Sequence, residues 1–329
     1  MPPLTRTLYL HLGPTKTGTS AIQYALSRHD GSSVLYPKVG LWPDGSHHNL
    51  VLNFFDHYQR RDVIRADAGQ LLAQIGELAR DSNRDVAISS EILSARRDLK
   101  EFVDALQRHI GGEALRVELL VLVREHFERA ASLYNQRVKD PVSAERRDPD
   151  LFLVEQAKAL RYAPLLQRLG KSGFDLTVLN YHPAESCVAR ALLHLGIPRS
   201  QIPDVPPRNV SLSIKVLIAV LAANRLALGE SARKECFLAL GKVSACYAPS
   251  RFIFGAGAAA EAERIFAEDR HFVRERFGIE LPVPDLVRSD AFIIERNEFD
   301  EISESMRDFG VSGPAVLDGL RPYLRRLEP

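Results

Sequence analysis

The chain has 329 residues, of which 45% are hydrophobic and 26% are charged, and its formal net charge is +1 at pH 7. This composition is typical of a globular protein with a buried core, and it disfavours a general nucleic-acid binder, which carries a clear excess of basic residues. The three cysteines are too few and too scattered for a disulfide framework or a zinc cluster, and we predict no metal site.

The first expected elements are a short apolar strand over residues 8–12, a turn with two glycines over 13–18, and a helix that follows. Such a loop directs backbone N–H groups into the space above the strand end, and the helix N-terminus adds partial positive charge. The pattern therefore predicts a phosphate site. Its expected contacts come from Thr15, Lys16, Thr17, Gly18, Thr19 and Ser20.

The spacing of Gly13 and Gly18 matches the Walker P-loop, but Thr19 stands where that motif has its lysine. The lysine of this chain, Lys16, lies inside the loop instead. A nucleotide kinase needs its lysine on the β- and γ-phosphates, so this position predicts another use. Residues 14–20 resemble the 5′-phosphosulfate loop of sulfotransferases that use 3′-phosphoadenylyl sulfate (PAPS), with one extra residue between proline and lysine.

A turn-rich segment over residues 40–50 contains the adjacent pair His47 and His48, and bacterial relatives of the sulfotransferases are similar here. Either His48 binds the acceptor or assists proton transfer, or the pair has no functional role. Since no third ligand is evident in the sequence, the pair does not predict a metal site.

A helix is expected over residues 63–80 and a buried strand over 85–91, with Glu91 at its carboxyl end. Ligands of parallel sheets bind outside the carboxyl ends of the strands, so Glu91 is expected to face the phosphate loop. The alternative is that this carboxylate only caps the helix that follows.

A helix over residues 98–110 and a strand over 115–123 lead to Arg124. Sulfotransferases follow a central strand with an arginine and, eight residues later, a serine, and both bind the 3′-phosphate of PAPS. Arg124 and Ser132 have this spacing and this strand context. An arginine alone would be interpreted as a solvated residue at a helix start, whereas beside the lysine loop it predicts a phosphate contact.

The rest of the chain continues the alternation of strands and helices, which predicts a parallel sheet with right-handed crossovers. The expected segments are a polar loop over 138–150, a long helix over 151–169, a strand over 174–181, and helices near 189–194, 214–228, 257–277 and 314–327. We therefore expect an α/β protein with a three-layer, P-loop-like fold. A single sulfotransferase-like domain would comprise a nucleotide-binding core over 1–200 and a mostly helical region over 201–329.

The resemblance implies a sulfotransferase that moves a sulfuryl group from PAPS to a hydroxyl or amine of a carbohydrate or glycolipid-like acceptor, and releases adenosine 3′,5′-bisphosphate. Lys16 would neutralise charge on the leaving group, Glu91 would be the base, and His48 is the rival base. A late basic loop of the family closes over the nucleotide, and Arg208 is its counterpart here. No metal is implied, because a sulfuryl group carries less charge than a phosphoryl group. Ala21 occupies the place where cytosolic relatives stack an aromatic on adenine.

Two other functions share parts of this pattern. A P-loop kinase or NTPase would also use the glycine loop and an acidic residue at a strand end, and a non-catalytic nucleotide-binding protein could keep the fold without turnover. The longest apolar run, residues 216–223, is too short to span a bilayer, and no leader sequence is recognised before the first strand. We therefore expect a cytoplasmic protein that has no membrane span and binds no nucleic acid.

Overall fold

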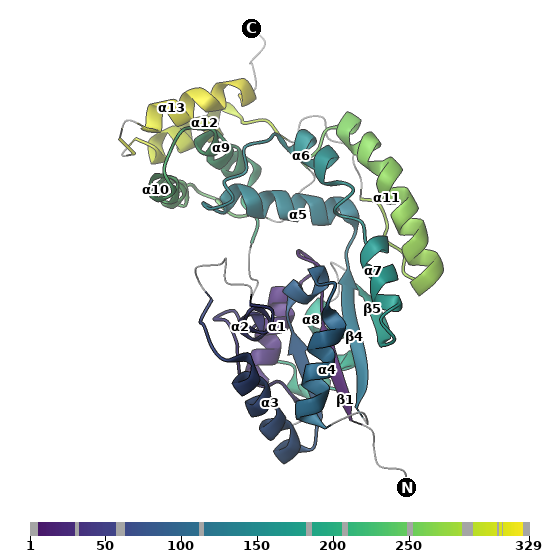
Figure 1. Ribbon diagram of the computed structural model, residues 1–329. Coiled ribbons are helices and arrows are strands. Elements are labelled where there is room, and N and C mark those ends of the chain that lie inside the picture. Colours follow the sequence, from purple (N-terminus) through teal and green to yellow (C-terminus); the bar gives the residue numbers. More distant parts are fainter. Residues whose placement is uncertain are drawn as a thin grey trace. The chain divides into compact units, whose positions relative to one another are not determined.

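The computed structural model describes residues 6–29, 33–56, 63–111, 115–181, 186–205, 210–248, 253–284, 292–307, 309–310 and 312–324. The chain forms two compact units, and each is composed of three separate stretches of sequence (Figure 1). Unit 1 comprises residues 1–124, 162–208 and 273–280. Unit 2 comprises residues 125–161, 209–272 and 281–329.

Unit 1 is built on a five-stranded sheet in which every pair of neighbouring strands is parallel. The strand order is β2-β3-β1-β4-β5, so β1 lies between β3 and β4. The α/β class and the parallel sheet predicted from the sequence are confirmed. The strands are β1 (Thr7–His11), β2 (Val34–Leu35), β3 (Asp85–Ser89), β4 (Arg116–Val123) and β5 (Asp175–Asn180).

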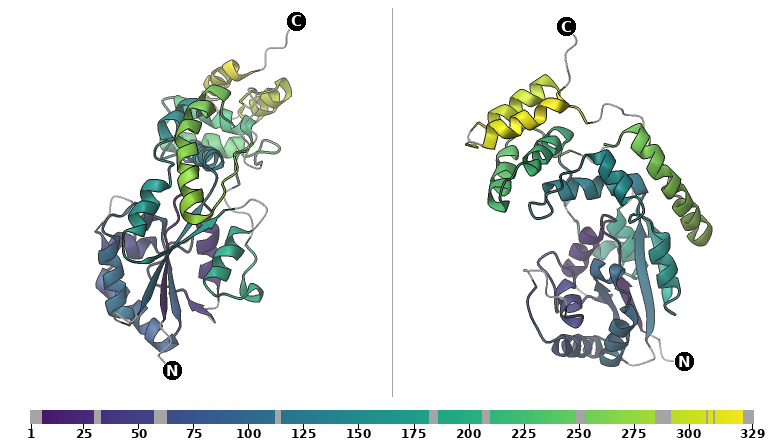
Figure 2. Two further views of the ribbon diagram at one scale, coloured as in Figure 1. Left: turned by 90° about the vertical axis from the view of Figure 1, so that its right-hand side faces the viewer. Right: turned by 45° about the horizontal axis from the view of Figure 1, so that its top comes forward.

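The apolar runs of the central strands explain their place in the sheet. In β4 every residue after Arg116 is buried, as expected for a strand covered on both faces. Helices lie on both sides of the sheet (Figure 2, left). On one side, α1 and α8 pack together over Leu120 and Leu122. The helices of unit 1 are α1 (Thr19–Arg28), α2 (His48–Phe54), α3 (Ala68–Ser82), α4 (Leu99–Ile110), α7 (Ala163–Gly170) and α8 (Cys187–His194).

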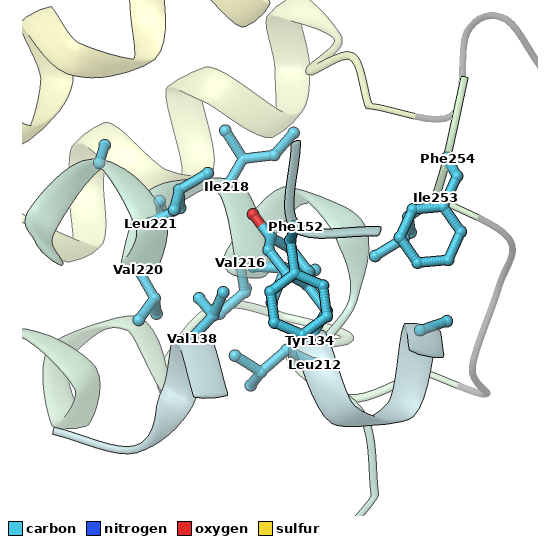
Figure 3. Close-up of a cluster of buried hydrophobic side chains, with 14 of the residues drawn as sticks. Tyr134, Val138, Phe152, Leu212, Val216, Ile218, Val220, Leu221, Ile253 and Phe254 are labelled. Atoms are coloured by element: carbon cyan, nitrogen blue, oxygen red, sulfur yellow. The ribbon is translucent and has the colours of Figure 1, made fainter. Parts of the chain in front are cut away.

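Unit 2 is helical in the part of the chain that the structure describes, and its core surrounds α9. Residues 216–224 of α9 are all buried, which explains why this helix has no polar face in the sequence. Tyr134 and Phe152 pack edge to face beside it, with ring centroids 5.1 Å apart (Figure 3). The helices are α5 (His126–Lys139), α6 (Pro149–Gln156), α9 (Ile214–Arg225), α10 (Glu230–Leu240), α11 (Ala256–Phe277), α12 (Arg296–Ser305) and α13 (Ser312–Leu320). The end of α11, residues 273–277, belongs to unit 1.

Two predictions of individual elements are wrong. The long helix expected over 151–169 is two helices, α6 and α7, because Pro164 lies in the first turn of α7. Proline has no N–H and its ring clashes with the preceding turn, so one helix cannot run through this point. The loop expected over 40–50 ends early, because α2 begins at His48. Among the described helices, none combines the length and the apolarity needed to cross a membrane.

Candidate functional site

The loop between β1 and α1 has an unusual backbone. Lys16 and Gly18 both have positive φ angles, of 70° and 90°. Thr17 is buried, and its hydroxyl donates to the carbonyl of Pro14 at 2.7 Å, which closes the loop on itself. Glycine adopts a positive φ readily, whereas a lysine there carries a conformational cost that the surrounding structure must offset. Such strain is typical of functional loops.

Both glycines of the loop are required by close contacts. A Cβ on Gly13 would lie 2.6 Å from Cγ2 of Thr19, and a Cβ on Gly18 would lie 2.7 Å from Sγ of Cys187. The Gly18 position also lies 3.3 Å from the ring of Tyr181. Neither Tyr181 nor Cys187 is among the site residues predicted from the sequence. Tyr181 follows the carboxyl end of β5. A position at the carboxyl end of a parallel strand is the signal from which Glu91 was predicted, and it could have found Tyr181 as well.

Glu91 lies beside the loop, as the strand-end rule predicts. It opens a short 3₁₀ helix, η1 (Glu91–Ala95), which Ser90 separates from the end of β3. Its carboxylate accepts a hydrogen bond from the Thr19 hydroxyl at 3.0 Å, so it contacts the first turn of α1. The end of β3 is tied to the end of β1 by the Ser90 N–H, which donates to the His11 carbonyl at 3.1 Å.

Arg124 approaches the loop from the end of β4. Its guanidinium lies 3.5 Å from the carbonyl oxygen of Lys16 and 4.6 Å from the centre of the Tyr181 ring. The hydroxyl of buried Tyr162 accepts from the Arg124 N–H at 2.9 Å and donates to the Arg124 carbonyl at 2.7 Å. Backbone and side chain of this arginine are therefore both held, with its charge beside the loop.

The two adjacent histidines have different surroundings. Ring Nε2 of His47 donates to the Pro37 carbonyl at 2.8 Å, and Nδ1 accepts from the Ser89 N–H at 3.2 Å. Burial lowers the pKa of His47 to about 4, so this ring is neutral and structural. His48 is also buried, and its Nδ1 lies 2.8 Å from the hydroxyl of Ser90, the residue before Glu91. The structure thus brings His48 and Glu91, the two candidate bases, to one strand end.

His11 is a further residue that the sequence analysis missed. It ends β1 and is 2% exposed, and its Nδ1 lies 2.7 Å from the Ser89 hydroxyl. Its Nε2 finds no hydrogen-bond partner among the described residues and lies 3.3 Å from the Cβ position of Gly13. Burial lowers its pKa to about 4, which keeps the ring neutral. His11 therefore forms a polar floor under the loop.

For the other predicted site residues, the structure gives fewer contacts or none. Thr15 is exposed, whereas Lys16 and Ser20 are half-buried in the loop and in the first turn of α1. Ser132 lies on α5 in unit 2, and its pairing with Arg124 across the two units stays a prediction. Arg208 lies outside the described residues. In the described part of the chain, no three His, Cys, Asp or Glu side chains form a group that could hold a metal ion.

No family model, curated protein or solved structure matches this chain. Loop N–H groups, Lys16 and Arg124 offer donors and positive charge for an anionic ligand. Glu91 and His48 are two groups able to accept a proton, and Tyr181 offers an aromatic face.

Proposed function

We propose that this chain is a sulfotransferase that transfers a sulfuryl group from PAPS to a hydroxyl or amine of a carbohydrate or glycolipid-like acceptor, on a P-loop-like fold. The observation that carries the proposal is that the guanidinium of Arg124 lies beside the backbone of the loop that contains Lys16, at the carboxyl end of β1. Lys16 lies within the loop in a left-handed conformation, and the guanidinium of Arg124 lies 3.5 Å from its carbonyl oxygen. PAPS has two separate anionic groups, the 5′-phosphosulfate and the 3′-phosphate, and so calls for two sets of donors.

In the proposed reaction the loop holds the 5′-phosphosulfate, and Arg124 holds the 3′-phosphate through its fork of N–H donors. As the S–O bond breaks, negative charge develops on the oxygen of the leaving adenosine 3′,5′-bisphosphate. The ammonium of Lys16 neutralises this charge, and the loop N–H groups keep the donor in line with the acceptor.

The acceptor hydroxyl loses its proton as its oxygen attacks the sulfur. Glu91 is the proposed base, because its carboxylate already contacts Thr19 beside the loop. His48 is the second candidate, held by Ser90 one residue away from Glu91. Either group would then carry the proton that the acceptor releases.

One contact supports a second candidate function. The hydrogen bond between Glu91 and Thr19 joins an acidic residue after one strand to a hydroxyl in the first turn of α1. P-loop NTPases hold Mg²⁺ between an acidic residue and the Ser or Thr that follows the Walker lysine, a position that Ser20, next to Thr19, occupies here. A P-loop kinase or NTPase is therefore the alternative, although Thr19 stands where such enzymes have their lysine.

Thermal unfolding with two nucleotides distinguishes these functions. We expect adenosine 3′,5′-bisphosphate to stabilise the protein without added metal, by about 2.7 kcal/mol at a hundred times its dissociation constant. Adenosine 5′-monophosphate is the control, since it lacks the 3′-phosphate and should bind more weakly. If only Mg²⁺–ATP stabilises the protein, the NTPase function is supported and the sulfotransferase function is contradicted. Binding of the bisphosphate without turnover on any acceptor would support a non-catalytic nucleotide-binding protein.

A further inference from the structure

Unit 2 contains a pocket of about 540 Å³ that no part of the proposed reaction uses. This volume is in the range of pockets that hold small molecules. The pocket is lined mainly by the connection between α5 and α6, together with one arginine of α10. Its lining residues are Arg137, Val142, Ser143, Ala144, Glu145, Arg146, Arg147 and Arg233.

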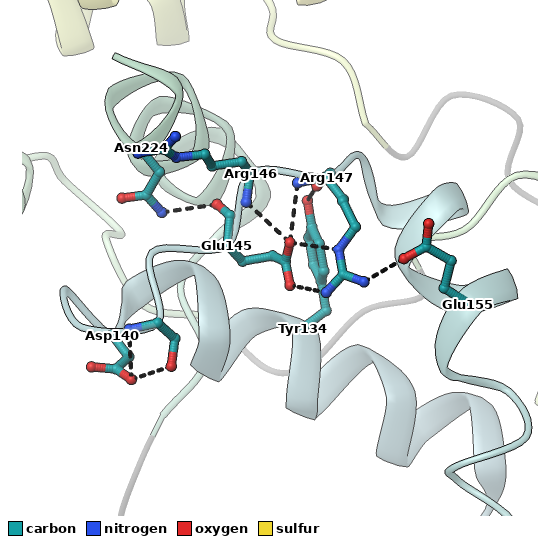
Figure 4. Close-up of polar contacts among 8 residues, drawn as sticks. Tyr134, Asp140, Glu145, Arg146, Arg147, Glu155 and Asn224 are labelled. Carbon is teal, nitrogen blue, oxygen red and sulfur yellow. Dashed lines mark hydrogen bonds and ion pairs between the residues drawn. The ribbon is translucent and has the colours of Figure 1, made fainter. Parts of the chain in front are cut away.

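The wall of the pocket is fixed by hydrogen bonds. The side-chain amide of buried Asn224 donates to the carbonyl of Val138 at 2.8 Å. It also donates to the carbonyl of Glu145 at 3.1 Å (Figure 4). The carboxylate of Asp140 accepts from the Ser143 hydroxyl at 2.5 Å and from a following backbone N–H. Ala144 closes the turn with a positive φ of 41°, and its N–H donates to the Asp140 carbonyl. The connection therefore has a defined shape before any ligand arrives.

The carboxylate in the lining is already ion-paired with an arginine. Glu145 is buried and accepts two hydrogen bonds from the guanidinium of Arg147, at 2.8 and 2.5 Å (Figure 4). The third guanidinium nitrogen of Arg147 donates a hydrogen bond to the carboxylate of Glu155 at 2.5 Å. Arg147 is thus shared by two carboxylates, and the positive charge of the lining comes from its other three arginines.

The other three arginines lack a carboxylate partner within the described residues. Arg233 donates to the carbonyl oxygens of Pro141 and Leu228, which are neutral. The guanidinium of Arg137 lies over the ring of Phe152, at 5.6 Å, and in the described part of the chain it forms no ion pair. The exposed guanidinium of Arg146 likewise has neither an ion pair nor a hydrogen bond among those residues.

We propose that this pocket binds a small molecule with two or more phosphate or sulfate groups. Three arginines whose guanidiniums lack a carboxylate partner among the described residues line one pocket, and their planar forks match the oxygens of these anions. A small molecule is favoured over a nucleic acid, since the positive groups line a pocket rather than an extended basic surface and the net charge of the chain is +1. The proposal stands on unit 2 alone and does not depend on the sulfotransferase.

Calorimetric titration with pyrophosphate tests the site. The titration uses the Lys16→Gln protein as its background, because pyrophosphate could also bind the loop of unit 1. We expect one site per chain, and a loss of affinity of about tenfold to a hundredfold for each of Arg137→Gln and Arg146→Gln. Arg146→Lys keeps the charge and should retain part of the affinity. Arg296→Gln is the matched control, since this exposed arginine of unit 2 lies on α12 and outside the pocket.

The outcomes separate the pocket from general charge attraction. No binding of pyrophosphate, or an equal loss in Arg296→Gln, would overturn the proposal. A melting curve establishes that each variant is folded, and Arg147 is left intact because it holds Glu145. A second titration uses a disulfated disaccharide. Comparison of its affinity with that of pyrophosphate shows whether the pocket prefers sulfate or phosphate groups. Tighter binding of a short oligonucleotide than of either probe would exclude a small-molecule site.

Discussion

At the scale of single residues, the backbone of Lys16 links stability to function. A residue other than glycine pays about 1–2 kcal/mol in the left-handed region, so Lys16→Gly removes a cost that Lys16→Ala keeps. After the greater flexibility of glycine in the unfolded chain is counted, we expect Lys16→Gly to be more stable than Lys16→Ala by about 1 kcal/mol. Urea unfolding measures the difference. Both variants lack the ammonium and should lose nucleotide affinity equally.

Equal stability of these two variants would show that residue 16 does not keep the left-handed conformation in solution. Unequal nucleotide affinity would show that the backbone of this residue, and not only its ammonium, sets the loop geometry.

Substitutions of single residues also test which side chain is the catalytic base, Glu91 or His48. Glu91→Gln keeps the shape of the side chain but removes its ability to take up a proton. If Glu91 is the base, we expect this change to lower the rate roughly 10²- to 10⁴-fold and to leave affinity for adenosine 3′,5′-bisphosphate nearly unchanged. His48→Asn should then mainly raise the acceptor KM. Single-turnover kinetics with PAPS and an accepted substrate measure both effects, and the reverse order would assign the base to His48.

At the scale of elements, Tyr162 joins the start of α7 to the end of β4. Tyr162→Phe leaves the N–H and the carbonyl of Arg124 without their partner, and we expect a loss of unfolding free energy of about 1–3 kcal/mol. Because Arg124 then loses its fixed position, affinity for adenosine 3′,5′-bisphosphate should fall as well. Arg124→Ala sets the upper limit for that fall, since it removes a charge-assisted contact worth about 1.5–3 kcal/mol.

Tyr134→Phe is the matched control for this prediction. The Tyr134 hydroxyl donates to the Arg147 carbonyl at 2.8 Å within unit 2, so its removal should cost stability but not nucleotide affinity. Equal loss of affinity in both variants would show that the effect of Tyr162 is a general loss of stability.

The sequence predicted the elements of unit 1 well where a long apolar run or a glycine marked them. Residues 115–123 and Gly111 are examples, because a buried parallel strand and a helix end each leave a local signal. The start of α2 at His48 has no such local signal in the sequence, because Asn49 and Asn53 are weak helix formers. Their side chains instead bond to residues around 41–42 and 64–66, which only the folded chain brings near.

The candidate site was predictable to a similar extent. Glu91 was found by the rule that ligands bind at carboxyl ends of parallel strands, and Arg124 by the resemblance of its strand context and spacing to those of sulfotransferases. His11 and Tyr181 obey the same rule, yet neither has a side chain that signals phosphate chemistry. Cys187 could not be predicted, because its contact with Gly18 arises from the packing of α8 beside α1.

At the scale of the whole molecule, two buried histidines make stability depend on pH. The pKa values of His11 and His47 are lowered by burial to about 4, against 6.5 in the unfolded chain. The unfolded state therefore takes up protons first, and the stability that these residues contribute is complete above pH 6.5 and is lost as the pH falls toward 4. We expect a loss of about 2 kcal/mol for each histidine at pH 5.

Urea unfolding of unit 1 at pH 7.5 and pH 5 measures this loss, with His47→Gln as the comparison. The variant lacks one of the two titrating rings, so its stability should fall by about 2 kcal/mol less over this range. Glu125 of unit 2 acts in the opposite sense, since burial raises its pKa to about 7 and its contribution is lost as the pH rises through that value. An unchanged pH dependence in His47→Gln would mean that this ring is not buried as a neutral group.

The chain passes between the two units at residues 124–125, 161–162, 208–209, 272–273 and 280–281. The last stretch of unit 1, residues 273–280, includes Glu280, whose carbonyl accepts from the Asn180 amide at 3.2 Å beside the end of β5. A nascent chain therefore cannot complete unit 1 until residue 280 has been synthesised, roughly 15–55 s after synthesis begins. All five strands precede residue 181, and β5 is an edge strand of the finished sheet as well, so this late stretch adds a side-chain contact at the end of β5 and no further strand.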